Sequence, residues 1–330
     1  MGSVMAERTY ITLYESGELA ARAVALQEQL NDCDICPRSC HVNRFENMQG
    51  FCGSGRLISV SNYCDHHGEE PALSGTRGSG TIFFNHCNLR CKYCQNHQIS
   101  QGTDNRPQTL SSSELAEIML HLQNDLQCHN INLVSPSHYV PQIVEALCHA
   151  IPAGLHIPLI YNTNGYDALD TLKMLDGVID IYLPDIKYSS NLYGDRFSNC
   201  SNYVELSRQA IKEMYRQAGN LVIDTSGIAQ SGLIVRHLIL PNDVAGSDDS
   251  LRWLANDISR DVTVSIMAQY YPCHLASQEP LVSRKISLEE YNHVAETVNE
   301  LGLENGWFQE IDSAEFYLPD FNHPGHPFSK

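Results

Sequence analysis

Three cysteines lie close together in the segment GSGTIFFNHCNLRCKYCQNHQIS, residues 78–100. Cys87, Cys91 and Cys94 have a C-x3-C-x2-C spacing that directly follows an apolar run, which predicts a strand. A four-iron cluster held only by cysteine needs four thiolates, so three thiolates leave one iron open to a reactive cofactor. Zinc would need His86 or His97 to complete its ligand set, and the spacing is not that of a zinc ribbon. We therefore expect an iron–sulfur cluster at this loop.

A second group of cysteines precedes the loop, among Pro, Gly and polar residues. Cys33, Cys36, Cys40 and Cys52 have the spacing C-x2-C-x3-C-x11-C. This segment has too little apolar material to fold alone, and a metal bound by four thiolates would supply folding free energy. Spacing alone leaves both a structural zinc and an auxiliary iron–sulfur cluster open. A third interpretation is that some of these thiols are redox-active or unligated.

The polar segment NYCDHHGEEP, residues 62–71, adds Cys64, His66 and His67, one of which could replace a ligand of that group. The favoured interpretation is instead a polar loop that shapes the mouth of the cysteine site. The remaining cysteines stand alone and are expected to be ordinary buried thiols: Cys128, Cys148, Cys200 and Cys273.

The composition limits the class of partner. The 330 residues include 39 acidic and 21 basic side chains, which gives a formal net charge of −18. Because affinity for nucleic acid rests largely on Lys and Arg, a nucleic-acid partner is disfavoured. No apolar run of about 18 residues and no leader peptide is visible, so we expect a cytoplasmic protein without a membrane span. Twelve cysteines in a large cytosolic chain indicate metal binding rather than disulfides.

Apolar periodicity predicts an N-terminal helix and then an alternation of strands and helices. The helix carries a stripe at Leu19, Ala23, Leu26 and Leu30. Strands are predicted over 79–84, 131–134, 158–163, 178–183, 233–240 and 262–270, with a further one over 307–311. Helices are predicted over 111–126, 142–150, 167–175, 203–218, 251–259 and 287–301. The alternation implies parallel strands joined by right-handed crossovers.

The expected fold class is therefore α/β, a partial or full (β/α) barrel with a cysteine-rich N-terminal extension. We expect three parts: the metal-binding extension over 1–77, the barrel over 78–311 and a C-terminal tail over 312–330. In such barrels the chemistry gathers at the carboxyl ends of the strands. Polar segments follow the predicted strands there: the cysteine loop, Ser135–His138, Asn162–Gly165, Asp185–Lys187, Pro241–Asn242 and Gln269–Tyr271. Their convergence on one mouth predicts a site.

Arg236 and His237 are neighbours in a predicted strand. Because successive side chains of a strand point to opposite faces, only one of the two can face the interior of the barrel. We expect His237 to be a buried, hydrogen-bonded histidine outside the site.

Four stretches of the sequence resemble a known family: YCDHHGEEPALSGTRGSGTIFFNHCNLRCKYCQN, INLVSPSHYVPQIVEAL, YNTNGYDALDTLKMLDGVIDIYLPDIKY and RHLILP. They are similar to the radical S-adenosylmethionine (SAM) superfamily and, within it, to an uncharacterised iron–sulfur branch of the pyruvate formate-lyase activating enzyme family. The resemblance runs from about the first cysteine group to the sixth strand. It implies an oxidoreductase whose [4Fe-4S] cluster cleaves SAM reductively to a 5′-deoxyadenosyl radical, which abstracts hydrogen.

The resemblance also carries residue roles onto this chain. The three loop cysteines would bind the cluster, and Tyr93 would lie against the adenine. Contacts to SAM would come from Asn164, Asp185 and Lys187. The residues themselves permit a second interpretation, in which Asp185 caps the following helix or forms a structural salt bridge with Lys187.

The chain departs from the family pattern after the second strand. Activating enzymes commonly have a Gly-Gly-Glu type segment there, which receives the amino group of SAM, and this chain has Val134–Ser137. Backbone carbonyls and hydroxyls, Ser135 among them, could do the same work.

The implied partners are a low-potential electron donor and, as a candidate, a protein substrate with a glycyl site, which would make this an activator of a glycyl-radical enzyme. The alternatives are a radical SAM enzyme with a small-molecule substrate and a noncatalytic iron–sulfur or zinc protein.

Overall fold

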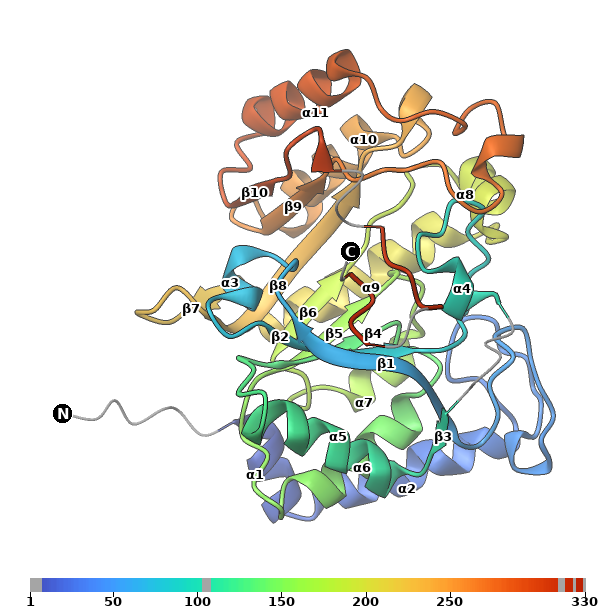
Figure 1. Ribbon diagram of the computed structural model, residues 1–330, viewed down its shortest axis with the longest axis vertical. Helices are drawn as coiled ribbons and strands as arrows, with labels where there is room; N and C mark the ends of the chain where they lie inside the picture. The colour runs from blue at the N-terminus through green and yellow to red at the C-terminus, as the bar shows by residue number, and fades with distance from the viewer. Residues whose placement is uncertain (1–7, 103–107, 314–317, 323–324, 329–330) are drawn as a thin grey trace.

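A curved, open sheet with helices on its outer side forms the body of the protein (Figure 1). The computed structural model describes residues 8–102, 108–313, 318–322 and 325–328. The sheet runs in the spatial order β10 (Gly306–Phe308), β9 (Thr263–Met267), β8 (Ala229–Leu238), β6 (Ile181–Pro184), β5 (Leu159–Thr163), β4 (Ile131–Val134), β2 (Ser79–Phe84), β1 (Ile58–His66) and β3 (Gln108–Leu110). A short strand, β7 (Val222–Ile223), pairs with β8.

The strands from β10 to β2 are parallel, whereas β1 at one edge pairs antiparallel with both β2 and β3. Within the described part of the chain, no pairing joins β10 to β3, so the sheet does not close. Of the two predicted forms, the structure has the partial barrel, and the α/β fold class is confirmed.

The central strands form where the sequence has short apolar runs between turns. All six residues of β2 and all five of β5 are buried. Because both faces of a parallel sheet are covered, such strands are apolar throughout instead of alternating. This is why β2 and β4 begin and end at the predicted residues.

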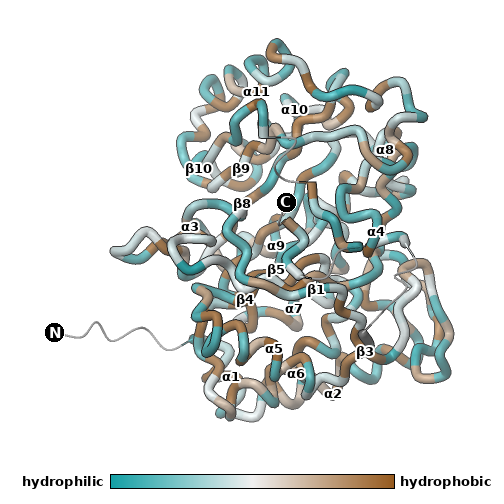
Figure 2. The backbone as a smooth tube through the Cα atoms, viewed as in Figure 1, coloured by the Kyte–Doolittle hydropathy of each residue, from teal (hydrophilic) through white to brown (hydrophobic). Residues whose placement is uncertain are grey.

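Most of the outer helices follow the predicted amphipathic pattern, whereas those over 9–15 and 191–198 were not predicted. The longer ones are α1 (Thr9–Glu15), α2 (Glu18–Glu28), α5 (Ser112–Asn124), α6 (Val140–Ala150), α7 (Leu169–Met174), α8 (Asn191–Ser198), α9 (Tyr203–Ala218), α10 (Ser247–Trp253) and α11 (Leu288–Leu301). Two short ones are α3 (Pro71–Ser74) and α4 (His97–Ser100). Hydrophobic and hydrophilic residues alternate along α5, α6 and α11 (Figure 2).

Local signals fix several helix ends. Ser111 and Glu114 form the predicted capping box of α5, and Ser287 and Glu290 form one on α11. The helix predicted over 251–259 begins earlier, as α10, and continues over 254–258 as one π-helical turn.

The predicted N-terminal stripe is buried. Leu19, Ala23, Leu26 and the following Leu30 are at most 6% exposed, and α2 packs against α6. The stripe therefore serves packing.

The first half of the segment NYCDHHGEEP is a strand, which corrects the expected polar loop for those residues. Residues 62–66 belong to β1, where Cys64 and His66 are buried. The polar residues between them hid the alternation that a half-buried strand shows. Cys64 packs with Phe83 and Ile99 and is not among the residues that line the cavity of the N-terminal cysteines. The second half of the segment, from His66 onward, lines the mouth of the barrel as expected.

Strands on both sides of the predicted boundary at residue 77 belong to one sheet, because β1 pairs with β2. The division into three parts otherwise stays a prediction. Described residues of the C-terminal tail cover this edge: the ring of Phe328 stacks on His66 at 4.3 Å, and Phe321 meets Phe83 edge-on at 5.3 Å.

In the described residues, every helix is too short or too polar to cross a bilayer.

Candidate active site

A cavity of about 970 Å³ opens at the carboxyl ends of the parallel strands. The cysteine loop after β2 lines it, as do Ser135 after β4, Asn164 after β5 and Asp185 after β6. Gln269, after β9, also reaches it. The predicted convergence of strand ends is therefore confirmed for these segments.

One predicted rim segment, Pro241–Asn242, lies elsewhere, and so does Tyr270 of another, which is a correction. Pro241 and Asn242 are not among the described residues that line the cavity. Asn242 Nδ2 instead donates to the Leu281 carbonyl at 2.7 Å. Tyr270 is buried, and its hydroxyl donates to the Val282 carbonyl at 2.5 Å. Both side chains are held by backbone carbonyls of the loop that precedes α11, while Gln269 of the second segment remains at the cavity.

Each loop cysteine has a polar neighbour at its sulfur. Asn164 Nδ2 donates to Cys87 Sγ at 3.3 Å, and Ser198 Oγ donates to Cys91 Sγ at 3.0 Å. The hydroxyl of Ser100 lies 3.2 Å from Cys94 Sγ. Such donors stabilise a sulfur that carries negative charge. The loop is therefore built to hold thiolates.

A row of hydroxyls leads to one of these sulfurs. The hydroxyls of Tyr93 and Tyr188 are 2.6 Å apart, and that of Tyr188 is 2.7 Å from Ser198 Oγ. Since Ser198 donates to Cys91, each hydroxyl in the row can donate to the next and all are satisfied. Sequence reasoning missed Ser198 and Tyr188, because α8 and the end of the Asp185 loop carry no motif.

Without a bound cation, the loop thiols stay protonated. Burial raises the pKa of Cys87 to about 11 and that of Cys94 to about 12, and neighbouring thiolates act in the same direction. A thiol must lose its proton to bind metal. The charge of a metal centre would be needed to hold all three as thiolates.

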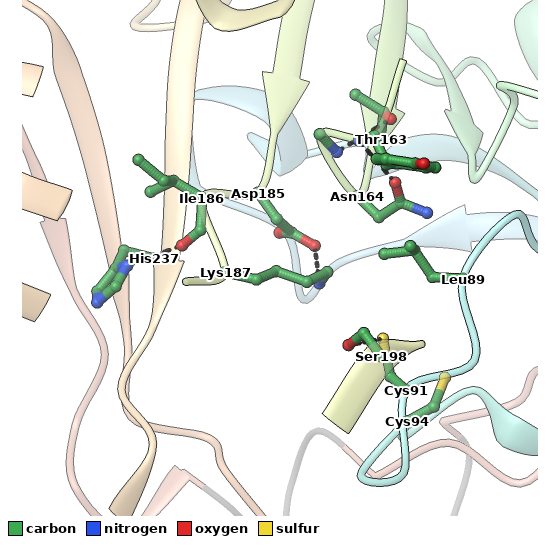
Figure 3. A network of polar contacts seen from close by, with 12 residues as sticks. Leu89, Cys91, Cys94, Thr163, Asn164, Asp185, Ile186, Lys187, Ser198 and His237 are labelled. Carbon is green, nitrogen blue, oxygen red and sulfur yellow. Dashed lines mark hydrogen bonds and ion pairs between the residues drawn. The ribbon is translucent and has the colours of Figure 1, made fainter. Parts of the chain in front are cut away.

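Asp185 and Lys187 form an ion pair in the cavity, on the side facing the cysteines (Figure 3). Burial would lower the pKa of Lys187, but Asp185 and the Cys91 sulfur outweigh it and raise that pKa. Lys187 is thus a fixed cation. The salt bridge of the second interpretation exists, and the contact with SAM stays a prediction.

The other predicted SAM contacts also lie at the cavity. Besides Cys87, Asn164 Nδ2 reaches Asn88 Oδ1 at 2.7 Å, so its amide is engaged with the cysteine loop. Ser135 has a left-handed backbone with φ 58°, and its N–H donates to the Asn162 carbonyl at 2.8 Å. Tyr93 lines the cavity with its ring against Tyr188 and Tyr270.

A group of paired charges that sequence reasoning missed lines the same cavity. Arg236 on β8 forms ion pairs with Glu69 and Glu70, which follow β1, and all three side chains are at most 14% exposed. Burial would raise the pKa of Glu70, but Arg236 outweighs this and lowers it. The acidic pair lay in the quoted segment GEEP. His237 points to the opposite face, where it bonds Ile186 and Ser247 as expected.

The N-terminal cysteines gather around a small enclosed cavity of their own, which Cys33, Cys36, Cys40 and Cys52 line. Among the described residues, no three Cys, His, Asp or Glu side chains are arranged so that they could hold a single metal ion. That holds for the loop cysteines as well. A cubane cluster does not require three side chains to converge on one ion, because each thiolate binds a different iron.

Residues 81–228 match the family described as the Radical SAM superfamily. The match supports a radical SAM domain in this part of the chain. Membership of that superfamily implies a [4Fe-4S] cluster and SAM as cofactors. The residues present fit such a cluster, because three thiols with hydrogen-bond donors face one cavity.

The chain is 28% identical over 280 residues to the uncharacterized protein MJ0674 of Methanocaldococcus jannaschii, which covers 83% of this chain and 76% of that protein. Among solved structures it is similar to SuiB of Streptococcus suis bound to S-adenosylmethionine, with 12% identity and a TM-score of 0.45. It is also similar to HydG, a maturase of the [FeFe]-hydrogenase, with 10% identity and a TM-score of 0.48. These matches cover 72% and 91% of this chain but only 52% of the SuiB chain and 65% of the HydG chain.

Proposed function

We propose that this protein is a radical SAM enzyme whose cluster is held by Cys87, Cys91 and Cys94. The observation that carries the proposal is that all three sulfurs face one cavity at the carboxyl edge of the sheet, each beside an amide or hydroxyl. When bound and reduced, the cluster supplies the electron that cleaves SAM reductively and begins hydrogen abstraction. The electron itself would come from a separate low-potential donor.

The ion pair of Asp185 and Lys187 would bind the amino-acid end of SAM. That end carries an ammonium and a carboxylate, and the pair offers one charge of each sign beside Cys91. On binding, the ion pair between Asp185 and Lys187 would be exchanged for two ion pairs with SAM. This exchange costs little desolvation of Asp185 and Lys187, because both side chains are already in the cavity. Tyr93 and Ser135 are the proposed neighbours of the remaining parts of SAM.

The test is anaerobic reconstitution with iron and sulfide, followed by addition of SAM and dithionite. We expect formation of 5′-deoxyadenosine, which a Cys87→Ala, Cys91→Ala, Cys94→Ala triple variant abolishes. The control is Cys148→Ala on α6, outside the described lining of the cavity, which should retain full yield. Equal 5′-deoxyadenosine from the triple variant would reject the cluster site. Absence of the product from every reconstituted form would favour a noncatalytic iron–sulfur or zinc protein.

Binding of SAM gives a second readout. Lys187→Met should weaken SAM binding by at least tenfold in equilibrium dialysis, because a buried cation opposite a carboxylate is lost. Lys173→Met is the control, since Lys173 pairs with Asp170 on the exposed side of α7. Equal affinity of the two variants would remove Lys187 from the site.

The substrate is proposed as a small molecule, with activation of a glycyl-radical enzyme as the second candidate. The cavity extends past the cysteine loop to Arg236 and Glu69, so it offers charged groups for a small polar substrate. Phe328 of the C-terminal tail lines the same cavity and narrows the way in for a peptide loop. The resemblance to activating enzymes supports the second candidate.

Electron paramagnetic resonance distinguishes the two substrates. The enzyme is mixed with SAM, reductant and glycyl-radical proteins from the same source. A doublet signal that depends on this protein would favour activation. If no such partner gives the doublet signal while 5′-deoxyadenosine forms in a metabolite extract, the small-molecule substrate is favoured.

We further propose that the four N-terminal cysteines hold a second metal centre, either zinc or an auxiliary iron–sulfur cluster. The cluster fits the side chains as they stand, because its thiolates bind different irons. Zinc would require the sulfurs to move closer together, because no three of the described Cys, His, Asp or Glu side chains converge on one ion. Their gathering around one enclosed cavity supports this. The loops that carry them are fixed to the barrel. Arg38 donates to the Asn88 carbonyl at 2.9 Å, and Arg90 donates to the Phe51 carbonyl at 2.5 Å. Both guanidinium groups also lie over the Phe51 ring.

A further inference from the structure

Arg44 is a buried cation beside the N-terminal cysteines. Its side chain is 1% exposed, and its guanidinium donates to the carbonyls of Gly55 and His138 at 2.6 to 2.9 Å. The ring of Tyr139 lies 5.8 Å away. All of these neighbours are uncharged, and in the part of the chain that the structure describes no carboxylate forms an ion pair with Arg44. Arginine is almost never fully buried unless it is paired.

The surrounding groups supply no anion while the cysteines are thiols. The described residues that line the cavity beside Arg44 include no Asp or Glu. Burial lowers the pKa of His138 to about 3, so its ring is neutral. In the metal-free protein the charge of Arg44 is therefore uncompensated, which is a costly arrangement.

A metal held by four thiolates would supply the missing charge. Zinc contributes +2 and an oxidised [4Fe-4S] core also contributes +2, so with four thiolates either centre has a net charge of about −2. Two backbone amides already point at these sulfurs: Phe51 N–H donates to Cys40 Sγ at 3.3 Å, and Ser54 N–H donates to Cys52 Sγ at 3.4 Å. Leu89 N–H makes the same contact with a loop cysteine.

We propose that Cys33, Cys36, Cys40 and Cys52 bind a dianionic tetrathiolate metal centre and that Arg44 is its buried counter-ion. The inference rests on the second metal centre proposed above and adds the residue that balances its charge. It also gives the extension a reason to fold against the barrel, because Arg44 joins the cysteine segment to the loop after β4 through His138.

The direction in which one substitution changes the melting temperature tests the role of Arg44. Arg44→Met is made in the metal-loaded wild-type chain and in a variant with all four cysteines replaced by serine. In the loaded protein we expect metal release to a chelator at least tenfold faster and a lower melting temperature. In the four-serine variant the same change should leave the melting temperature unchanged or raise it, because it removes an uncompensated charge. Equal losses in both backgrounds would mean that Arg44 only donates hydrogen bonds, which would overturn the proposal.

Two further variants keep the test decisive. Arg56→Met is the matched control, since Arg56 is an exposed arginine over the Phe45 ring of the same segment, and it should not change metal release. If Arg44→Met does not fold, Arg44→Lys retains the charge, and metal-stripped and metal-loaded wild-type chains replace the serine background. Release from Arg44→Lys as fast as from Arg44→Gln, which keeps hydrogen-bond donors but has no charge, would overturn the counter-ion role.

Metal analysis distinguishes the centre from the SAM cluster. The triple variant without the loop cysteines should still contain one zinc or about four irons per chain. Either metal supports the site, and zinc or iron identifies the centre. Finding neither would reject the centre and with it this inference, while 5′-deoxyadenosine formation by the wild-type chain would be unaffected. Loss of that product alone would reject the SAM function and leave the N-terminal site standing.

Discussion

Replacing Ser198 by alanine removes the hydroxyl that donates to the Cys91 sulfur at 3.0 Å. Ser198 is fully buried, so no water can take its place without rearrangement. A hydrogen bond to a charged group contributes about 1.5–3 kcal/mol, and it strengthens when reduction adds negative charge to the cluster. If the bond is stronger by about 1 kcal/mol in the reduced state, the one-electron midpoint potential falls by about 40 mV on its loss. We therefore expect Ser198→Ala to lower the midpoint by about 40 mV.

An anaerobic redox titration followed by electron paramagnetic resonance measures this shift. Ser198→Thr retains a hydroxyl and should stay within about 15 mV of the wild type. Ser207→Ala is the matched control, because Ser207 is equally buried but donates to the Val204 carbonyl inside α9. A midpoint in Ser198→Ala that is unchanged or higher would refute the donor role of this hydroxyl. The melting temperature of the metal-free Ser198→Ala variant tells whether loss of packing contributes to the shift in midpoint potential.

Three further predictions concern stability. Burial raises the pKa of Asp180 to about 6, so the folded state holds this proton more tightly than the unfolded state does. The contribution of Asp180 to the free energy of unfolding therefore declines as the pH rises from about 4 to 6. Urea unfolding of Asp180→Asn should lack this decline. Arg236→Met leaves two buried carboxylates unpaired and should cost about 3 kcal/mol in urea unfolding, against less than about 1 kcal/mol for Arg284→Met at a more exposed pair. Gly165→Ala puts a Cβ 2.4 Å from a backbone carbonyl oxygen at φ +80° and should lower the melting temperature by more than Gly154→Ala, where φ is also positive but nothing lies within 4 Å; equal effects would contradict the close approach.

Local patterns in the sequence were sufficient for the parts of the fold whose contacts are local or buried on all sides. β2 and β4 begin and end where their apolar runs do, and Ser111 caps α5 through a box of four residues. β1 was missed, because its polar positions face out at the sheet edge and its partners are distant in the chain. Pairing at an edge is decided by the neighbouring strand and not by the strand's own pattern.

The sequence by itself determined the chemistry of the site. The spacing of Cys87, Cys91 and Cys94 and their position after a buried strand were enough to place three thiols at the carboxyl edge of a parallel sheet. Asp185 followed from the same rule. The placement of these four residues at one edge could be predicted without tertiary contacts, because loop length and strand direction alone bring such groups together.

Only the tertiary structure decided which groups support those thiols and balance the buried charges. Ser198 lies 107 residues from Cys91 in the chain, and Glu70 lies 166 residues from Arg236. Neither has a local signal, since a serine at a helix end and a glutamate after a strand are common everywhere. A buried charge or sulfur is satisfied by whatever the folded chain brings within about 3 Å, and that distance depends on the packing of the whole sheet.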